Sequence, residues 1–294
     1  MRDHTTTGLI DIIKIRAMVP ISQDTFPRAT ILDIATDEIR AVIIPSILAT
    51  NEEWLLTSTN PAYARSVDVP KNAISGSLRD IQLVKGSSLR SVPKLSVEDL
   101  NNSDASQNRV GFIIEDTAIK FYGAEHDSVM LRFYASPGAL VTTDTCAQIT
   151  AASYDSGQDV TTFTTSANPT DWATTLSVDF VSNTPFYKST SVNTTATVDD
   201  STTVTVAGDL TATVLVGDWI APTGTSPIAQ IPQEWLPYLA QAVVSVILEA
   251  QGDFEAAAKS TSRQMALKAS LLGTITPRVR GEAKKIVAVK NRRT

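Results

Sequence analysis

Apolar residues follow a helical spacing near both ends of the chain and a two-residue alternation across its middle. In residues 26–43 they recur every three or four positions, and Pro27 suits a first helical turn. Pro45 has no amide proton and would clash with the preceding turn, so we expect this helix to kink or stop near Val42. A second helical spacing follows Pro232, with apolar residues at Leu236, Leu239, Val243, Val246, Ile247 and Ala250. Each helical end has an apolar stripe to bury, and the simplest prediction is that the two ends pack together.

The C-terminal helical stretch is divided by the dipeptide Gly252-Asp253. Glycine is favoured just after a helix and aspartate is a good N-cap, so this pair predicts a two-residue turn between helices. We therefore expect residues 233–272 to form an antiparallel helical hairpin that is ended by Gly273 and Pro277.

Residues 65–140 change to an alternating pattern. Short alternating runs flank the turn residues 85–87 and 115–116, which predicts two β-hairpins. Residues 129–134 alternate as a further strand. Between the hairpins, the Ser and Asp of residues 96–99 have the spacing of a capping box, which predicts a short helix.

The segment 141–231 has a composition of its own, because 23 of its 91 residues are Thr and nine are Asp. Thr and Val favour half-buried strands, and Asp beside Gly favours turns, so we expect a separate antiparallel β module. Its strands are expected in the runs TTLSVDFVS, TTVTVAG and TATVLVGDWI. The alternative is a disordered low-complexity segment, against which the alternation and its aromatic residues argue. Those aromatic residues are Trp172, Phe180, Phe186 and Trp219.

Together these patterns predict an α+β protein. Its helical core consists of N-terminal helices and the C-terminal helical hairpin, accompanied by β-hairpins, an inserted antiparallel β module and an extended C-terminal tail. We expect the first part of the core in residues 1–140 and the inserted module in 141–231. The hairpin in 232–276 then completes the core, and a basic tail occupies 277–294.

Charge is distributed unevenly along the chain. Seven Lys or Arg and one Glu give residues 278–294 a charge of +6, so a net charge of −6 leaves residues 1–277 with −12. The run KKIVAVK is also β-prone, which predicts a strand that adds to another protein's sheet edge, with its cations directed to an acidic rim. The alternative is a solvated, disordered terminus. The predicted binding residues are Arg278, Arg280, Lys284, Lys285, Ile286, Val287, Val289, Lys290, Arg292 and Arg293.

Cys146 is the single cysteine, so no internal disulfide forms and the pattern fits a reducing cytoplasm. Charged residues interrupt the N-terminal apolar stretch before it reaches signal-peptide length. The longest apolar run is far short of the roughly 20 residues that cross a bilayer. We expect a soluble, unexported protein that does not bind a membrane.

The sequence contains few residues or motifs that could support catalysis or bind a metal. His4 and His126 are the only histidines and have no metal-ligand spacing, and no phosphate-binding loop or nucleophile elbow occurs. We therefore predict no catalytic residue, cofactor or metal. An enzyme that uses carboxylates alone is an alternative, with the pairs Asp37-Glu38 and Glu115-Asp116 as candidates. Both pairs are expected to be ordinary solvated acids. Aromatic residues are not interleaved with Lys or Arg, so a stacking surface for single-stranded nucleic acid is not expected. Sequence-specific DNA recognition is not expected either, but an acidic surface lets a duplex slide past.

Five segments in a fixed order resemble the head-to-tail connector, or adaptor, proteins of tailed bacteriophages. They are QDTFPRATILDIATDEIRAVIIPSILATNEEWLLT, VPKNAISGSLRDIQLV, LRFYASPGALV, VGDWIAPTGTSPIAQIP, and LAQAVVSVILEAQGDFEAA together with LLGTITPRVRGEAKKIV. The β insertion stands where these relatives carry one. Residues 134–136 depart from the family pattern, which has a basic residue just before the Pro.

This resemblance implies a homo-oligomeric ring, expected to be a dodecamer, below the portal in the neck of the virion, assembled in the host bacterial cytoplasm. It implies that the ring contacts portal, neck and tail proteins and surrounds packaged double-stranded DNA, with the C-terminal segment reaching into the portal. An alternative is a neck or tail module whose β insertion recognises another virion protein or a glycan. For the ring, we expect subunit contacts at Val244, Ala257, Ala258 and Leu271 unless these residues fill the monomer's own core.

Overall fold

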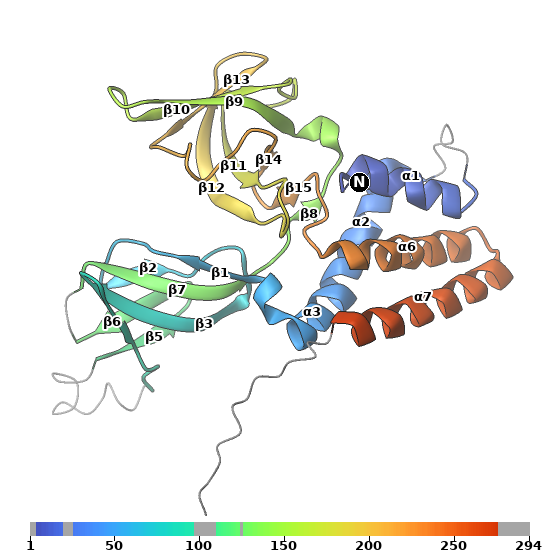
Figure 1. Cartoon of the computed structure of the whole chain (residues 1–294), viewed down its shortest axis with the longest axis horizontal. Helices are drawn as coiled ribbons and strands as arrows, with labels where there is room; N and C mark the ends of the chain where they lie inside the picture. The colour runs from blue at the N-terminus through green and yellow to red at the C-terminus, as the bar shows by residue number, and fades with distance from the viewer. Residues whose placement is uncertain (1–3, 20–25, 97–109, 124–125, 276–294) are drawn as a thin grey trace, which may run out of the picture.

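A computed structural model describes residues 4–19, 26–96, 110–123 and 126–275. Helices and antiparallel sheets both contribute, so the predicted α+β class is confirmed. Figure 1 shows the helices gathered on one side, a β-barrel above, and two smaller sheets below and to the left.

The helical part contains five α-helices and a π-helical turn among the described residues. They are α1 (Thr6–Arg16), α2 (Arg28–Glu38), the π turn (Ile39–Ile43), α3 (Ile44–Thr50), α6 (Leu236–Ala250) and α7 (Phe254–Ile275). Short 3₁₀ turns lie at Glu52–Trp54, Thr143–Thr145 and Gln233–Trp235.

Helix α6 is the centre of the helical part. It contacts α1, α2 and α7, and residues 238–245 are all buried, including the polar Gln241 and Ser245, which hydrogen-bond with Ser260 of α7. At its start the fully buried Trp235 packs edge-on against Tyr238, with 5.4 Å between the ring centroids. The two helical ends of the chain therefore pack together, as the sequence predicts.

Helix α1 was not predicted from the sequence. The Thr5 side chain accepts a hydrogen bond from the Gly8 amide at 3.4 Å and caps the helix, and Leu9, Ile10 and Ile13 are buried in the helical core. The charged Asp11 and Lys14 interrupt the apolar spacing, which concealed the helix.

The helix before Pro45 neither stops nor separates from α3. Instead the π turn widens the helix directly before the proline, and the Ile44 amide donates to the Ile39 carbonyl five residues earlier. The Ser46 hydroxyl also donates to the Val42 carbonyl at 2.7 Å. The expected distortion is therefore present, but a wider turn accommodates the proline and the chain remains helical.

The C-terminal hairpin forms as predicted. Gly252 has a φ of +80°, and the Asp253 carboxylate accepts from the Ala256 amide at 3.0 Å. The expected end at Gly273 is wrong, because α7 continues to Ile275. A glycine inside a helix costs only about 1 kcal/mol, and the neighbouring Leu271 and Leu272 pack against the helical core.

Two small sheets follow α3. The first has the order β1-β7-β3-β4 and the second the order β2-β6-β5. Both predicted hairpins and the predicted strand at 129–134 are confirmed, whereas the short helix expected at 96–99 lies almost wholly outside the described residues. The strands are β1 (Leu56–Thr59), β2 (Ser66–Asp68), β3 (Ala73–Lys85), β4 (Ser88–Ser91), β5 (Gly111–Glu115), β6 (Ala118–Tyr122) and β7 (Ser128–Ala135).

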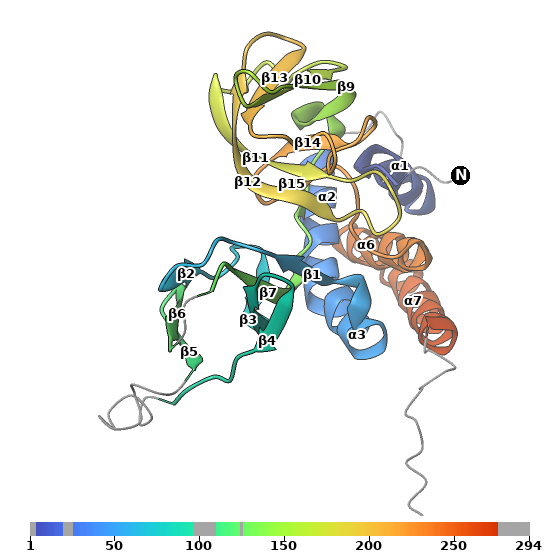
Figure 2. The same cartoon turned by 60° about the vertical axis from the view of Figure 1, so that its left-hand side comes forward.

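The Thr- and Asp-rich segment forms a closed six-stranded barrel of order β10-β13-β12-β11-β14-β9. Phe163 and Phe180 meet in its interior with 5.0 Å between ring centroids. The chain enters through β8 and leaves through β15, which pair in parallel beside the helical part. Figure 2 shows the barrel above both the helices and the small sheets. The strands are β8 (Ala139–Leu140), β9 (Ala147–Asp155), β10 (Val160–Thr165), β11 (Thr175–Val181), β12 (Ser189–Val198), β13 (Thr203–Ala207), β14 (Trp219–Pro222) and β15 (Thr225–Ser226).

The run 211–220 was expected as a strand, but only its last two residues belong to one, at the start of β14. The buried Asp218 explains the difference. Its two carboxylate oxygens accept from the Leu215 and Asn183 amides, both at 2.8 Å, so the preceding residues turn around this carboxylate. Asp179 acts in the same way, because it accepts from the Asn193 amide at 2.7 Å and the Gly224 amide at 2.8 Å.

We expect Asp218→Ala to destabilise the barrel by about 2–3 kcal/mol, because two backbone amides lose their acceptor in a partly buried site. Urea unfolding followed by fluorescence measures the change. Asp209→Ala is the matched control, because exposed Asp209 accepts only within its own turn, from Thr211, and we expect a loss below about 1 kcal/mol. Equal losses in the two variants would contradict the role assigned to Asp218.

Candidate partner-binding surfaces

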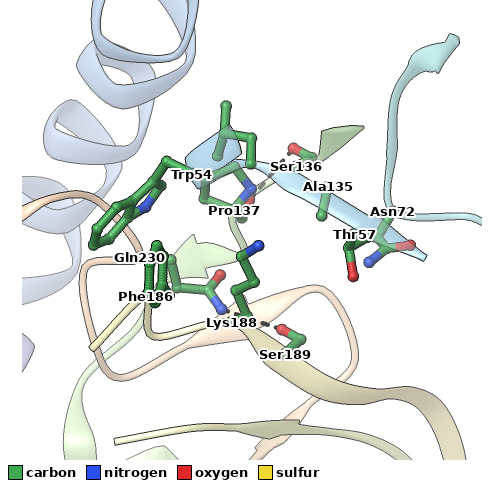
Figure 3. A pocket seen from close by; sticks show the side chains of 11 residues that line it. Trp54, Thr57, Asn72, Ala135, Ser136, Pro137, Phe186, Lys188, Ser189 and Gln230 are labelled. Carbon is green, nitrogen blue, oxygen red and sulfur yellow. Dashed lines mark hydrogen bonds between the residues drawn. The ribbon is translucent and has the colours of Figure 1, made fainter. Parts of the chain in front are cut away.

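The barrel, the small sheets and the helical part meet at a junction built around three side chains, seen from close by in Figure 3. The Trp54 ring, next to α3, lies 4.7 Å from the Phe186 ring of the barrel, centroid to centroid. The Lys188 ammonium lies 5.6 Å from the Phe186 centroid and donates to the Leu56 carbonyl of β1 at 2.5 Å. Burial lowers the pKa of Lys188. This side chain links the barrel to the edge of the first sheet.

Gln230 provides a second link at the same junction. Its side-chain amide donates to the Tyr187 carbonyl at 2.8 Å and to the Ser189 hydroxyl at 3.1 Å, and its oxygen accepts from the Gly138 amide at 2.7 Å. The entry to the barrel, its β11–β12 connection and its exit are thus joined through one residue. The cavity beside these residues has a volume of about 30 Å³, which is room for about one water molecule. We interpret the junction as a structural joint.

The carboxylate pairs considered for catalysis lie in separate parts of the molecule. Asp37 is exposed on α2, whereas Glu38 is half-buried and accepts from the Tyr238 hydroxyl at 2.7 Å. Burial and this hydrogen bond raise the pKa of Tyr238 to about 12. Glu115 pairs with Lys120 across the β5–β6 hairpin, and Asp116 lies exposed in its turn. Glu38 therefore links α2 to α6, and was wrongly expected to be simply solvated.

The remaining reactive groups are buried or lie against other side chains. Cys146 is buried, and desolvation raises the pKa of its thiol to about 12, so it is protonated at neutral pH. The His4 ring stacks on Tyr187 at 4.5 Å. In the part of the chain that the structure describes, no three His, Cys, Asp or Glu side chains form a group able to hold a metal ion. None of the described helices has both the length and the apolar character needed to cross a bilayer.

Two of the four predicted subunit-contact residues are corrected by the structure. Val244, 2% exposed, is buried in the chain's own helical core, because α1, α2 and α7 pack against α6. Ala257 is buried on α7. Leu271 is half-buried against the same core. Of the four predicted residues, only Ala258, on α7, is exposed. The alternative left open by the sequence, that such residues fill the monomer's core, holds for Val244 and Ala257.

Other apolar side chains of the helical part are exposed, and these were not among the predicted subunit-contact residues. Phe254 and Met265 on α7 are 69% and 67% exposed, and Val246 on α6 is 43% exposed. Ile15 on α1 and Met18 just beyond it are also exposed. On α7, Phe254, Ala258 and Met265 follow a spacing of four and seven residues, which places them on one side of the helix. The same spacing can be read from the sequence, and it would have identified Phe254 and Met265 as residues on the same side of the helix as Ala258.

The predicted portal-binding residues, from Arg278 to Arg293, lie outside the described residues, which end at Ile275. No family model and no curated protein matches the chain.

Proposed function

We propose that this protein is a structural adaptor of a tailed bacteriophage. Copies of the chain form a ring below the portal, link the capsid to the tail, and surround the DNA channel. The proposal rests on the resemblance of five ordered segments to head-to-tail connector proteins, together with one structural observation. That observation is the set of exposed apolar side chains on a helical part whose own core is already filled.

The exposed apolar residues of α7 support self-association. Phe254, Ala258 and Met265 lie on one side of α7, while the buried side of this helix packs on α6. A monomer has no need of large exposed apolar groups at such positions, and burying them against a neighbouring copy removes that surface from water. A ring requires a repeated contact of this kind between identical subunits.

The charge distribution supports the placement of the ring. Residues 1–277 carry −12, so the body repels phosphate and lets a duplex pass without being held. The basic residues 278–294 are suited to an acidic rim on the portal. The joints at Lys188 and Gln230 fix the barrel to the rest of the subunit, as a mechanical connector requires.

Native mass spectrometry of the purified full-length chain tests the ring. The expected result is one closed assembly at an integral multiple of the 31.5 kDa subunit, with twelve copies implied by the resemblance. If the chain were monomeric at a subunit concentration of about 10 µM, well above the Kd of standard protein interfaces, the ring would be excluded.

A second candidate function is a binding module in which the barrel recognises another virion protein. The observation that favours it is an apolar pair, Leu215 and Val216, exposed by 49% and 65% on the connection before β14. Apolar side chains of this type suit a protein contact better than a glycan. Binding of cell-wall polysaccharide by the intact protein would reverse that order.

A further inference from the structure

Three neighbouring hollows join into one groove between the first sheet and the barrel. Asn72 and Ser189 line all three, so the hollows are continuous. The larger two have volumes of about 570 and 240 Å³, and the third is the small cavity of the junction. The groove is therefore of a size that holds several residues of a ligand, in contrast to the junction cavity alone.

One wall of the groove is the unpaired edge of β1. In the described part of the chain β1 pairs only with β7, and Leu55 and Pro61, on either side of β1, both accept from backbone amides on the β7 side. Antiparallel strands alternate, so the backbone groups of Leu56 and Ser58 point away from β7. The Leu56 carbonyl accepts from Lys188 there, whereas the backbone of Ser58 remains available.

The facing wall is the first half of β12. Strand β13 pairs only with residues 196–198 of β12. In the stretch 189–193, Ser189 and Ser191 pair with β11 on one side, and the stretch pairs with no described strand on the other. Hydroxyl groups dominate the lining of both walls, from Thr57, Ser58 and Thr59 on one side and Ser189, Thr190 and Ser191 on the other. Two strand edges that flank a polar groove are a template for an added strand.

One end of the groove is rich in hydrogen-bond donors and positive charge. Arg40 and Lys71 line it, and none of the ion pairs in the described residues includes them or Lys188. Trp54, which lines the junction cavity together with Lys188, contributes a buried ring N–H without an acceptor in the described structure. Two carboxylates line the groove: Asp179, whose oxygens are both committed to backbone amides, and the exposed Asp68, which lines the hollow of about 570 Å³ together with Lys71.

This positive end is a local exception in a chain whose residues 1–277 carry −12, and acidic side chains complement it. We propose that the groove binds an extended acidic segment of another polypeptide, which adds to the free edge of β1 and places its carboxylates beside Arg40 and Lys71. The basic C-terminal tail of this chain does not fit that charge. The assignment concerns the groove alone and does not depend on the adaptor proposal.

Isothermal titration calorimetry of the intact full-length protein with two synthetic peptides tests the charge. One is an acetylated, amidated decapeptide of alternating Thr and Glu, and the other has Lys at each Glu position. We expect the Glu peptide to bind with a Kd of about 100 µM or lower at low salt, more weakly as salt rises, and the Lys peptide not to bind. Preference for the Lys peptide would instead indicate a basic segment such as the tail of a neighbouring copy, and would overturn the proposal.

Two matched pairs of variants test the site itself. Ser58→Pro removes the outward amide without breaking a bond to β7 and is expected to weaken binding of the Glu peptide by about tenfold or more. Ser58→Ala removes only the hydroxyl and keeps this amide, so it is expected to bind the Glu peptide more tightly than Ser58→Pro does. Arg40→Ala with Lys71→Ala is expected to weaken it at least about tenfold. The control is Lys85→Ala with Arg90→Ala on the exposed β3–β4 hairpin, which leaves binding unchanged.

Four further outcomes contradict the proposal. They are no peptide binding, equal binding of both peptides, wild-type binding by Ser58→Pro, and equal losses in the two double variants. Hydrogen–deuterium exchange of the free protein then tests whether the edge of β1 is free. Slow exchange at Ser58 would show that a neighbouring copy or the chain itself already pairs with β1, and would also contradict the proposal.

Discussion

Removal of residues 277–294 is expected to abolish capture of the chain by portal rings while leaving its own assembly intact. The deleted segment carries seven Lys or Arg and the β-prone run KKIVAVK, which we expect to add as a strand at an acidic rim of the portal. The described fold ends at Ile275, so the helical core is expected to survive the deletion. Sedimentation of mixtures of the chain with purified portal rings measures the effect, and a loss of at least about 100-fold in affinity is expected.

The matched control for this deletion separates charge from length. A chain in which Lys284, Lys285 and Lys290 are replaced by Gln keeps the full tail and its apolar residues but loses cations. We expect weaker capture that falls less steeply with added salt, because three of the seven cations whose attraction is screened by ions are gone while the four Arg of the tail remain. Wild-type capture by the deleted chain would show that the tail is not the portal-binding segment.

Substitution of Phe254 and Met265 together by Asp is expected to convert the assembly to monomers. Both side chains are more than two-thirds exposed on α7 and lie outside the chain's own core, so the monomer's stability is expected to change by less than about 1 kcal/mol. In a ring, the same substitutions place carboxylates in an apolar contact at every subunit boundary, where unpaired charge is costly. Native mass spectrometry distinguishes a ring from 31.5 kDa monomers directly.

Exposed polar positions on α7 provide the control for the ring. Lys259→Asp with Arg263→Asp changes the same number of side chains on the exposed surface of this helix, away from the line of Phe254, Ala258 and Met265. We expect this variant to remain assembled. An intact ring in the Phe254→Asp, Met265→Asp variant would place the subunit contact elsewhere on the molecule.

Much of the fold follows from local pattern. The turn at Gly252-Asp253 and the β-hairpins each rest on short-range chemistry that the sequence displays directly. Alternation also identified the barrel strands β11 and β13, but not β9, β10 or β12, and it wrongly predicted a strand in 211–218, where a long-range contact prevails. Asp218 draws these residues into a turn by binding the amide of Asn183, 35 positions away. No local pattern contains that information.

The candidate surfaces were harder to predict for a similar reason. Residues 238–245 of α6 are all buried, including the polar Gln241 and Ser245, so the sequence of this helix does not say which neighbours cover it. Val244 was therefore assigned to a subunit contact although the chain's own helices bury it. Helix α1, missed in the sequence, is one of those neighbours. The groove beside β1 is lined by Thr and Ser, which carry no distinctive spacing, and exists only because the sheet and the barrel meet there.

The central claim is that this chain forms the ring between portal and tail. Electron cryomicroscopy of the neck of intact particles that contain the chain tests it most directly, because one map shows symmetry, position and partners. The proposal predicts a closed ring of this fold below the portal, with residues 278–294 ordered against portal subunits and the barrel attached through the Lys188 joint. A map that places the chain elsewhere in the particle, or shows these terminal residues away from any portal subunit, would contradict the account.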